Sequence, residues 1–297
     1  MIDFAFNKKR AQELHAAASA LNDAGNSEEA IATYKLAIET DPEKSESYYN
    51  IGLIYKYRNA WEHSLDFNRR AYELDPQDEA ARWNMAIAAT ALRDWQTARL
   101  AWKDQGLSFD TDEGPIDGNF GRTPVRLNPD GDAEVVWAYR IDPVRARIAN
   151  IPLPQSGYRC RDIVLHDGAA VGHRMLGERE CPVFNVLELF EPSALNTFQL
   201  LIDLVTPDAA QRFLGMFAVA NIDVEDWTSS YQVLCKQCSE GRPHEQHDHH
   251  GTRQSGAWQV RRRIGIAALC LEDVEAVLKA CTGPGVSTLD LTCELTA

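Results

Sequence analysis

Long hydrophobic runs are missing from this chain of 297 residues. A membrane-spanning helix needs about 18 or more consecutive apolar residues, and no segment comes near that length. The first residues, Met1–Phe4, also lack the basic and then apolar regions of a secretory signal. We therefore expect a cytoplasmic protein that does not insert into a membrane.

Positive charge is in short supply. The chain has 30 Lys and Arg against 44 Asp and Glu, which gives a formal net charge of −14. A nucleic-acid-binding protein needs a basic surface against the phosphate backbone, so this charge argues against nucleic acid as a partner. The run Arg261–Arg263 lies in an expected strand, where successive side chains alternate between faces. We expect these arginines to pair with acidic neighbours.

Cysteine does not occur before Cys160, and the seven cysteines between Cys160 and Cys293 are an odd number. In a reducing compartment such cysteines are free thiols or metal ligands more often than disulfides. Cys270, Cys281 and Cys293 lie in segments of apolar pattern, so we expect them to be buried.

Familiar catalytic motifs are absent as well. The sequence has no H-E-x-x-H helix, no G-x-S-x-G turn, no phosphate-binding glycine loop and no dinucleotide fingerprint. We assign no catalytic residue from the sequence.

What the chain does have is a pattern that recurs every 34 residues. Pro42 and Pro76 each close a unit, and the apolar and small residues before them stand at matching offsets. The first unit carries Leu14, Ala17, Ala18, Leu21, Ala30, Tyr34 and Ala37, and the second carries Tyr48, Ile51, Gly52, Tyr55, Ser64, Asn68 and Ala71. A third copy begins at Glu79 and loses the pattern at Gln105–Gly106. The pattern predicts three helix-turn-helix units, with proline ending the second helix.

This pattern resembles the tetratricopeptide repeat (TPR) family, and the resemblance covers about residues 11–106. It implies helix pairs stacked into a curved solenoid, with small residues such as Ala18, Gly52 and Ala86 where helices approach closely. The concave face of such a solenoid holds an extended peptide or a partner's tail, so the resemblance implies protein or peptide binding.

The register places a set of side chains on the inward face of the first helix of each unit. The candidate groove residues are His15, Tyr49, Asn50, Leu53, Trp83, Asn84 and Ile87. Only Asn50 and Asn84 fit the cationic and amide pattern of TPR proteins that clamp a chaperone's carboxylate end, so we do not favour that ligand. Tyr49 and Trp83 are ligand anchors or, alternatively, packing residues at helix crossings.

Beyond the repeats the pattern changes twice. Residues 107–121 are acidic and rich in turn formers, and we predict a solvated linker there. Residues 122–192 contain short alternating runs punctuated by Pro and Gly, which predict a small β-rich domain, a sheet or partial barrel. The expected strands cover 134–138, 146–151, 162–165 and 183–189.

Residues 193–297 predict the order β-α-β-β-α-β. The expected strands are 198–205, 231–235, 258–269 and 287–293, with helices from 207 and over 272–280. This order is typical of a ferredoxin-like α+β fold. The predicted fold class is therefore multidomain α and α+β, with repeats over 1–106, the linker, the β-rich domain and this last domain.

A cysteine- and histidine-rich loop lies between the two central strands of that last domain, over residues 235–250. Cys235, Cys238, His244 and His249 form C-x2-C-x5-H-x4-H, which resembles the compact ligand spacing of zinc knuckles. His247, His250 or Asp248 could replace either histidine, so the full ligand set stays open. A metal would offset the entropy cost of ordering this loop, so we predict structural zinc.

Other uses of this loop stay open. The cysteine pair would be a redox couple if it opened a helix in a βαβ unit, and the histidines would be a solvated tip if no metal bound. With only three protein ligands, zinc would activate a water, and Glu240, Glu245 or Asp248 would serve as general base. The sequence thus predicts a TPR-type protein-binding adaptor with structural zinc; the alternative is a zinc-dependent hydrolase that recruits substrate through its repeats.

Overall fold

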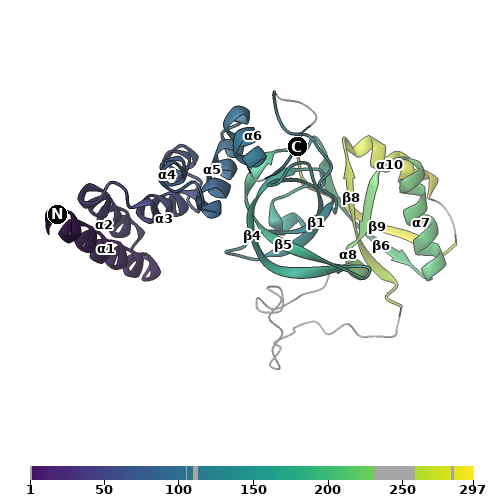
Figure 1. Cartoon of the computed structure of the whole chain (residues 1–297). Helices are drawn as coiled ribbons and strands as arrows, with labels where there is room; N and C mark the ends of the chain where they lie inside the picture. Colours follow the sequence, from purple (N-terminus) through teal and green to yellow (C-terminus); the bar gives the residue numbers. More distant parts are fainter. Residues whose placement is uncertain (1, 105, 110–112, 231–257, 282–283) are drawn as a thin grey trace. The chain divides into compact units, whose positions relative to one another are not determined.

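The computed structural model describes residues 2–104, 106–109, 113–230, 258–281 and 284–297. The chain divides into two compact units, Met1–Gly118 and Asn119–Ala297. The helices belong mainly to the first unit and the strands to the second (Figure 1). The boundaries at 106, 121 and 192 remain predictions. Within the described residues, no helix is both long and apolar enough to span a bilayer.

Three helical hairpins build the first unit, as the 34-residue pattern predicts. In the part of the chain that the structure describes, they are α1 (Ile2–Asp23) with α2 (Ser27–Thr40), α3 (Ser45–Lys56) with α4 (Trp61–Leu74), and α5 (Glu79–Ala91) with α6 (Trp95–Asp104). Their apolar residues lie between the helices; in the first two hairpins the buried cluster is Ala18, Ala30, Ile31, Tyr34, Ile51 and Ile54. Packing of these faces stabilises the helices more than intrinsic propensity does.

The turn inside each hairpin repeats in its backbone. Gly25, Asn59 and Arg93, which are 34 residues apart, all have left-handed φ angles, of 83°, 54° and 60°. The amide after each of them donates to a carbonyl five residues earlier, at 2.9–3.0 Å, as in Asn26 to Leu21. This is the pattern of a Schellman cap, which satisfies the last carbonyls of a helix and reverses the chain.

Part of the predicted linker is attached to the last helix of this unit. The buried guanidinium of Arg99 donates to the carbonyl oxygens of Gly114 at 2.8 Å and of Glu113 and Pro115 at 3.1 Å. The backbone of residues 113–115 therefore lies against α6, while Glu113 and Pro115 are exposed, and the solvated linker over 107–121 stays a prediction.

The second unit begins with a five-stranded closed barrel. Its strands are β1 (Arg122–Leu127), β2 (Glu134–Arg140), β3 (Arg145–Ile148), β4 (Ile163–Leu176) and β5 (Arg179–Glu191), with a short 3-10 turn, η1 (Pro154–Ser156), between β3 and β4. Neighbours are antiparallel except β1 and β5, which close the barrel in parallel. The interior holds Val125, Leu127, Val136, Ala138, Ala146, Ile148, Val164 and Val186. The predicted β-rich segment is confirmed, and its strands close fully.

The C-terminal part of this unit is a four-stranded sheet with helices. Its elements are β6 (Asn196–Leu204), α7 (Pro207–Val219), β7 (Asp223–Asp226), α8 (Trp227–Ser230), β8 (Arg261–Ala268), α10 (Leu271–Ala280) and β9 (Val286–Leu295). The strand order is β7-β8-β6-β9, and every neighbouring pair is antiparallel. The strand expected at 231–235 falls outside the described residues. In the part of the chain that the structure describes, the strand that comes before β8 is β7.

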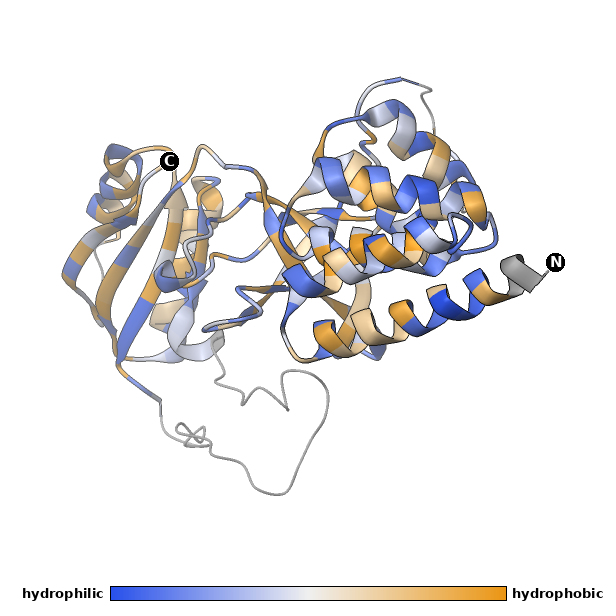
Figure 2. Cartoon of the chain, turned by 90° about the vertical axis from the view of Figure 1, so that its left-hand side faces the viewer, coloured by the Kyte–Doolittle hydropathy of each residue, from blue (hydrophilic) through white to orange (hydrophobic). Residues whose placement is uncertain are grey.

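The two long helices cover one face of this sheet, as Figure 1 shows. Phe213 and Phe217 of α7 and Val274 of α10 share a buried cluster with Leu200 of β6 and Ile266 of β8. Hydrophobic and hydrophilic residues alternate along the strands (Figure 2), as a sheet with one face in a core requires.

The other face of the sheet meets the barrel through Trp227. Its indole nitrogen donates to the carbonyl of Ile151 at 2.8 Å, and its ring packs with Leu153, Cys160 and Ala267. The barrel and the sheet therefore share a second small core, which explains why residues 119–297 form one compact unit.

The arginine run at the start of β8 behaves as expected for two of its members. Arg261 pairs with Asp203 at 3.1 Å and the buried Arg262 pairs with Asp226 at 3.0 Å. Arg263 differs, because its side chain donates to the amide oxygen of Gln199. Alternation along the strand places Arg262 on the opposite face from Arg261 and Arg263, whose partners both lie on β6.

Candidate functional site

The candidate groove is formed by the first helix of each hairpin, α1, α3 and α5. The structure places the predicted groove residues on these helices. His15, Tyr49, Asn50, Leu53 and Trp83 are half-buried, whereas Asn84 is 5% exposed and Ile87 is 0% exposed. The set therefore divides into residues that reach the surface and residues that belong to the core.

Ile87 corrects the sequence interpretation. All residues from Asn84 to Thr90 are buried, because α5 is rich in alanine and packs on every side. A helical register identifies which face points inward, but it does not show how deeply that face is covered. Ile87 is a core residue in this structure, and Asn84 lies almost as deep.

The polar groove residues of the first two hairpins, His15 and Asn50, each lie within hydrogen-bond distance of a side chain from the other hairpin. The His15 ring nitrogen Nδ1 lies 3.0 Å from the Ser47 hydroxyl, and the His15 ring packs edge-on against Tyr34 with centroids 5.3 Å apart. The Asn50 amide donates to the Tyr34 hydroxyl at 2.9 Å. Tyr34 was expected only as a packing residue; its spacing gave no sign that its hydroxyl joins α2 to α3.

Burial lowers the pKa of His15, and the positive charge of Lys44 lowers it further. The ring is therefore neutral at pH 7, since even its ordinary pKa is about 6.5. A neutral His15 cannot supply a positive charge to a ligand's carboxylate.

The third hairpin provides an amide and an aromatic ring. Lys56, which is only 3% exposed, donates from Nζ to the Asn84 side-chain oxygen at 3.1 Å. The Trp83 ring packs edge-on against Trp102, with centroids 4.8 Å apart. Trp83 therefore packs against α6, as the alternative interpretation held, while part of its side chain remains accessible.

The accessible part of this face is uncharged at its centre. Tyr49, Leu53 and Trp83 contribute apolar surface and Asn50 contributes an amide, while the cation of Lys56 lies deep and bound to Asn84. Such a surface offers apolar contact and amide hydrogen bonds to a polypeptide. It is poorly suited to a carboxylate group, which binds best to accessible cations.

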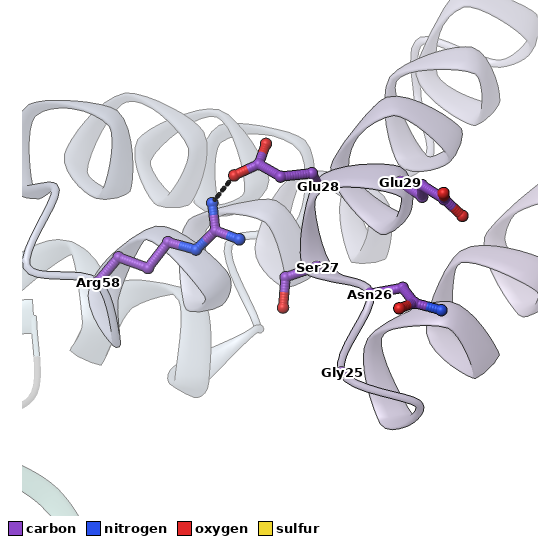
Figure 3. A pocket seen from close by; sticks show the side chains of 6 residues that line it. All are labelled: Gly25, Asn26, Ser27, Glu28, Glu29 and Arg58. Carbon is purple, nitrogen blue, oxygen red and sulfur yellow. Dashed lines mark hydrogen bonds and ion pairs between the residues drawn. The ribbon is translucent and has the colours of Figure 1, made fainter.

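A separate hollow of about 250 Å³ lies at the hairpin turns and is shown in Figure 3. It is lined by Gly25, Asn26, Ser27, Glu28, Glu29 and Arg58. The Arg58 guanidinium forms an ion pair with Glu28 across it, so its main charges neutralise each other. We regard this hollow as a contact between neighbouring repeats.

The predicted metal ligands Cys235, Cys238, His244, His247 and His249 lie outside the described residues. In the ranges that the structure describes, no group of three or more His, Cys, Asp or Glu side chains is arranged to hold a metal ion.

The described cysteines are free thiols. Cys160 and Cys181 are buried, but Cys270 and Cys281 are only half-buried and Cys293 is exposed. The expectation of burial for the last three was wrong. Cys293 lies in β9, which is an edge strand of the sheet. An apolar pattern in an edge strand does not ensure that both faces of the strand are covered.

Comparison with known proteins identifies part of the repeat region. A family model described as a TPR repeat matches residues 18–58. No curated protein matches the chain. Among solved structures, the second TPR domain of Spaghetti (RPAP3) bound to the HSP90 peptide SRMEEVD is 21% identical, with a TM-score of 0.33 over 35% of this chain and 90% of that one. The N-terminal region of this protein therefore contains a TPR repeat.

Proposed function

We propose that this protein is a protein-binding adaptor whose helical repeats hold an extended segment of a partner. The observation that carries the proposal is the TPR match at residues 18–58, within hairpins whose first helices present Tyr49, Leu53 and Trp83 at the surface. Half-buried aromatic side chains of this kind are frequent anchors at protein interfaces.

The chemistry of the face favours one kind of ligand. Its polar groups, Asn50, Asn84 and His15, already bond to Tyr34, Lys56 and Ser47. A ligand would gain mainly from apolar contacts with the three anchors and from hydrogen bonds of its own backbone. We therefore propose an extended segment with apolar side chains, in preference to an acidic, carboxylate-terminated tail.

The test compares the full-length protein with a Tyr49→Ala, Leu53→Asn double variant. Both substitutions leave the Trp83–Trp102 contact intact, so the fold should persist. Partners captured by the wild type from the native cell extract and identified by mass spectrometry should be lost from the variant. A Leu36→Ala, Leu100→Ala variant is the matched control, because these leucines are exposed on the second helices α2 and α6. Equal capture by the groove variant and the wild type would exclude this surface.

We also propose that the Cys/His loop holds one structural zinc ion through Cys235, Cys238, His244 and His249, with His247 as a substitute ligand. Its support is the ligand spacing in the sequence. Metal analysis of protein purified without chelators should find one zinc per chain. The Cys235→Ser, Cys238→Ser variant should lose both this zinc and thermal stability, and unchanged values for both would refute the site. An exchangeable water on the metal would instead favour the hydrolase alternative.

Finally, we infer that residues 193–297 form a ferredoxin-like domain. The order β7-β8-β6-β9 supports this inference, because β8, the third strand of this sheet along the chain, lies between the first two strands, β6 and β7. Both long helices on one face are also typical of a split β-α-β arrangement. Fold alone does not define an activity.

A further inference from the structure

The outer surface of the barrel carries a row of arginine and aromatic side chains across three strands. Val136 and Ala138 of β2 belong to the barrel interior, so the intervening Trp137 and Tyr139 lie on the outside. Tyr139 is directly opposite Arg122 of β1 on one side and Arg147 of β3 on the other. We call Arg122, Trp137, Tyr139 and Arg147 the cation-aromatic face.

The side chains of this face are close together and accessible. Directly opposite residues of an antiparallel pair have Cβ atoms about 5 Å apart. The Arg122 guanidinium carbon lies 5.0 Å from the centroid of the Trp137 ring and 5.8 Å from that of Tyr139. Tyr139 is 52% exposed, and Arg147 is exposed as well.

The charges of the face are not neutralised from within. Over the residues that the structure describes, neither Arg122 nor Arg147 forms an ion pair, and the Arg122 Nε is buried without a hydrogen-bond partner. Not every arginine of the second unit is paired, since the exposed Arg179 forms no ion pair with a described residue, but three others each have a carboxylate partner. These pairs are Arg145–Asp142, Arg159–Asp162 and Arg161–Asp223.

Arg122 and Arg147, on either side of Tyr139, have no carboxylate partner among the described residues, although the chain contains 44 acidic residues. Like charges held in one row repel each other, and an external anion would relieve that repulsion. Arg, Trp and Tyr are also the residue types that dominate binding energy at protein interfaces. The face thus combines fixed positive charge with exposed aromatic area.

We propose that the cation-aromatic face binds an acidic polypeptide segment of a partner protein. The two guanidinium groups would take carboxylate side chains, each through paired N–H donors, and Tyr139 and Trp137 would contact the segment's apolar groups. Single-stranded nucleic acid also binds to stacked aromatics and cations, but a phosphate chain needs a positively charged groove that follows its backbone, and this face offers only Arg122 and Arg147. This surface is separate from the proposed repeat groove and concerns a second class of ligand.

The test uses the full chain and a fluorescein-labelled peptide of alternating Glu and Val, followed by fluorescence anisotropy. The peptide should bind, and its affinity should fall with added salt. The Arg122→Ala, Arg147→Ala variant should weaken binding at least about tenfold. Arg147→Glu, a change at one exposed side chain, should weaken it as well, and its unaltered melting temperature would show that the fold is intact.

Two control variants show whether binding depends on this face and not on another part of the surface. Arg179→Ala, an exposed arginine of β5, and the Tyr49→Ala, Leu53→Asn groove variant should both bind the peptide as the wild type does. Equal affinity for a Gln-for-Glu peptide, or no loss in the double arginine variant, overturns the proposal. Tighter arginine-dependent binding of oligothymidylate also overturns it and points to nucleic acid.

Discussion

Two side chains with shifted pKa values, Glu134 and His166, should make the stability of this protein depend on pH. Desolvation raises the pKa of Glu134 to about 7, although the Leu153 amide donates to its carboxylate at 3.0 Å, and the nearby Glu225 raises it further. Burial has the opposite effect on His166, whose pKa falls to about 4 inside the barrel. Both groups therefore favour their neutral forms in the folded state.

The first prediction concerns Glu134. Its folded pKa lies above the usual value of about 4.5, so its contribution to the free energy of unfolding falls as the pH rises from about 4.5 through about 7. At pH 8, the Glu134→Gln variant should be more stable than the wild type by at most about 3 kcal/mol, because the amide is never ionised. Urea unfolding at pH 8 and pH 5 measures this difference, which should shrink at the lower pH.

Comparing the Glu134→Gln variant with the wild type at each pH cancels the contribution of His166 to the free energy of unfolding. That ring must gain a proton on unfolding below pH 6.5, so it destabilises the fold in acid and is common to both proteins. A constant difference between Glu134→Gln and the wild type across this range would contradict the prediction.

At the scale of helices and strands, the elements best predicted from the sequence are those held by local contacts. The repeat can be recognised from the sequence because each unit is held together by residues close in the chain. Pro42 and Pro76 lie 34 residues apart, and so do the left-handed turn positions 25, 59 and 93. Strand β1 was not predicted, because Pro124 and two arginines hide its alternation. All six of its residues pair with the neighbouring β2, and the parallel pairing with β5 that closes the barrel, about 60 residues away in sequence, leaves no local pattern.

The second prediction tests the repeated turn. Arg93 has a φ of 60°, a conformation that costs a residue with a Cβ about 1 kcal/mol or more. Arg93→Gly should therefore be more stable than Arg93→Ala by about 1 kcal/mol, which reverses the ordinary preference for alanine in helical segments. Thermal and urea unfolding of both variants provides the measurement. A more stable alanine variant would show that the turn relaxes to another conformation.

At the scale of the whole molecule, the second unit depends on a contact that no local pattern shows. Gly265 of β8 faces the Trp227 ring so closely that an added Cβ would lie 2.4 Å from it. The ring in turn connects the sheet to the barrel through Ile151. The sequence predicted the β-rich and α+β segments of this unit, but it predicted neither this contact nor the depth at which Ile87 is buried, because contacts between elements leave no local pattern in the chain.

The third prediction concerns this contact. Gly265→Ala should displace Trp227 and break its hydrogen bond to Ile151, which lowers the stability of the second unit by about 2–4 kcal/mol. Near-ultraviolet circular dichroism should show the tryptophan move. Gly215→Ala is the matched control, because nothing lies within 4 Å of its added Cβ in α7. It should leave stability unchanged or slightly improved, and equal effects of both variants would show that the Trp227 contact is not the cause.

The recurrence of left-handed residues at 25, 59 and 93 has a consequence for how this protein can change during evolution. The same left-handed turn joins the two helices of each of these hairpins, so a gene duplication or deletion of 34 codons from one such turn to the next would leave matching ends on both sides. The scaffold could lengthen or shorten in whole steps while the barrel and sheet that follow stay as they are. The number of repeats and the rest of the protein can therefore be selected independently.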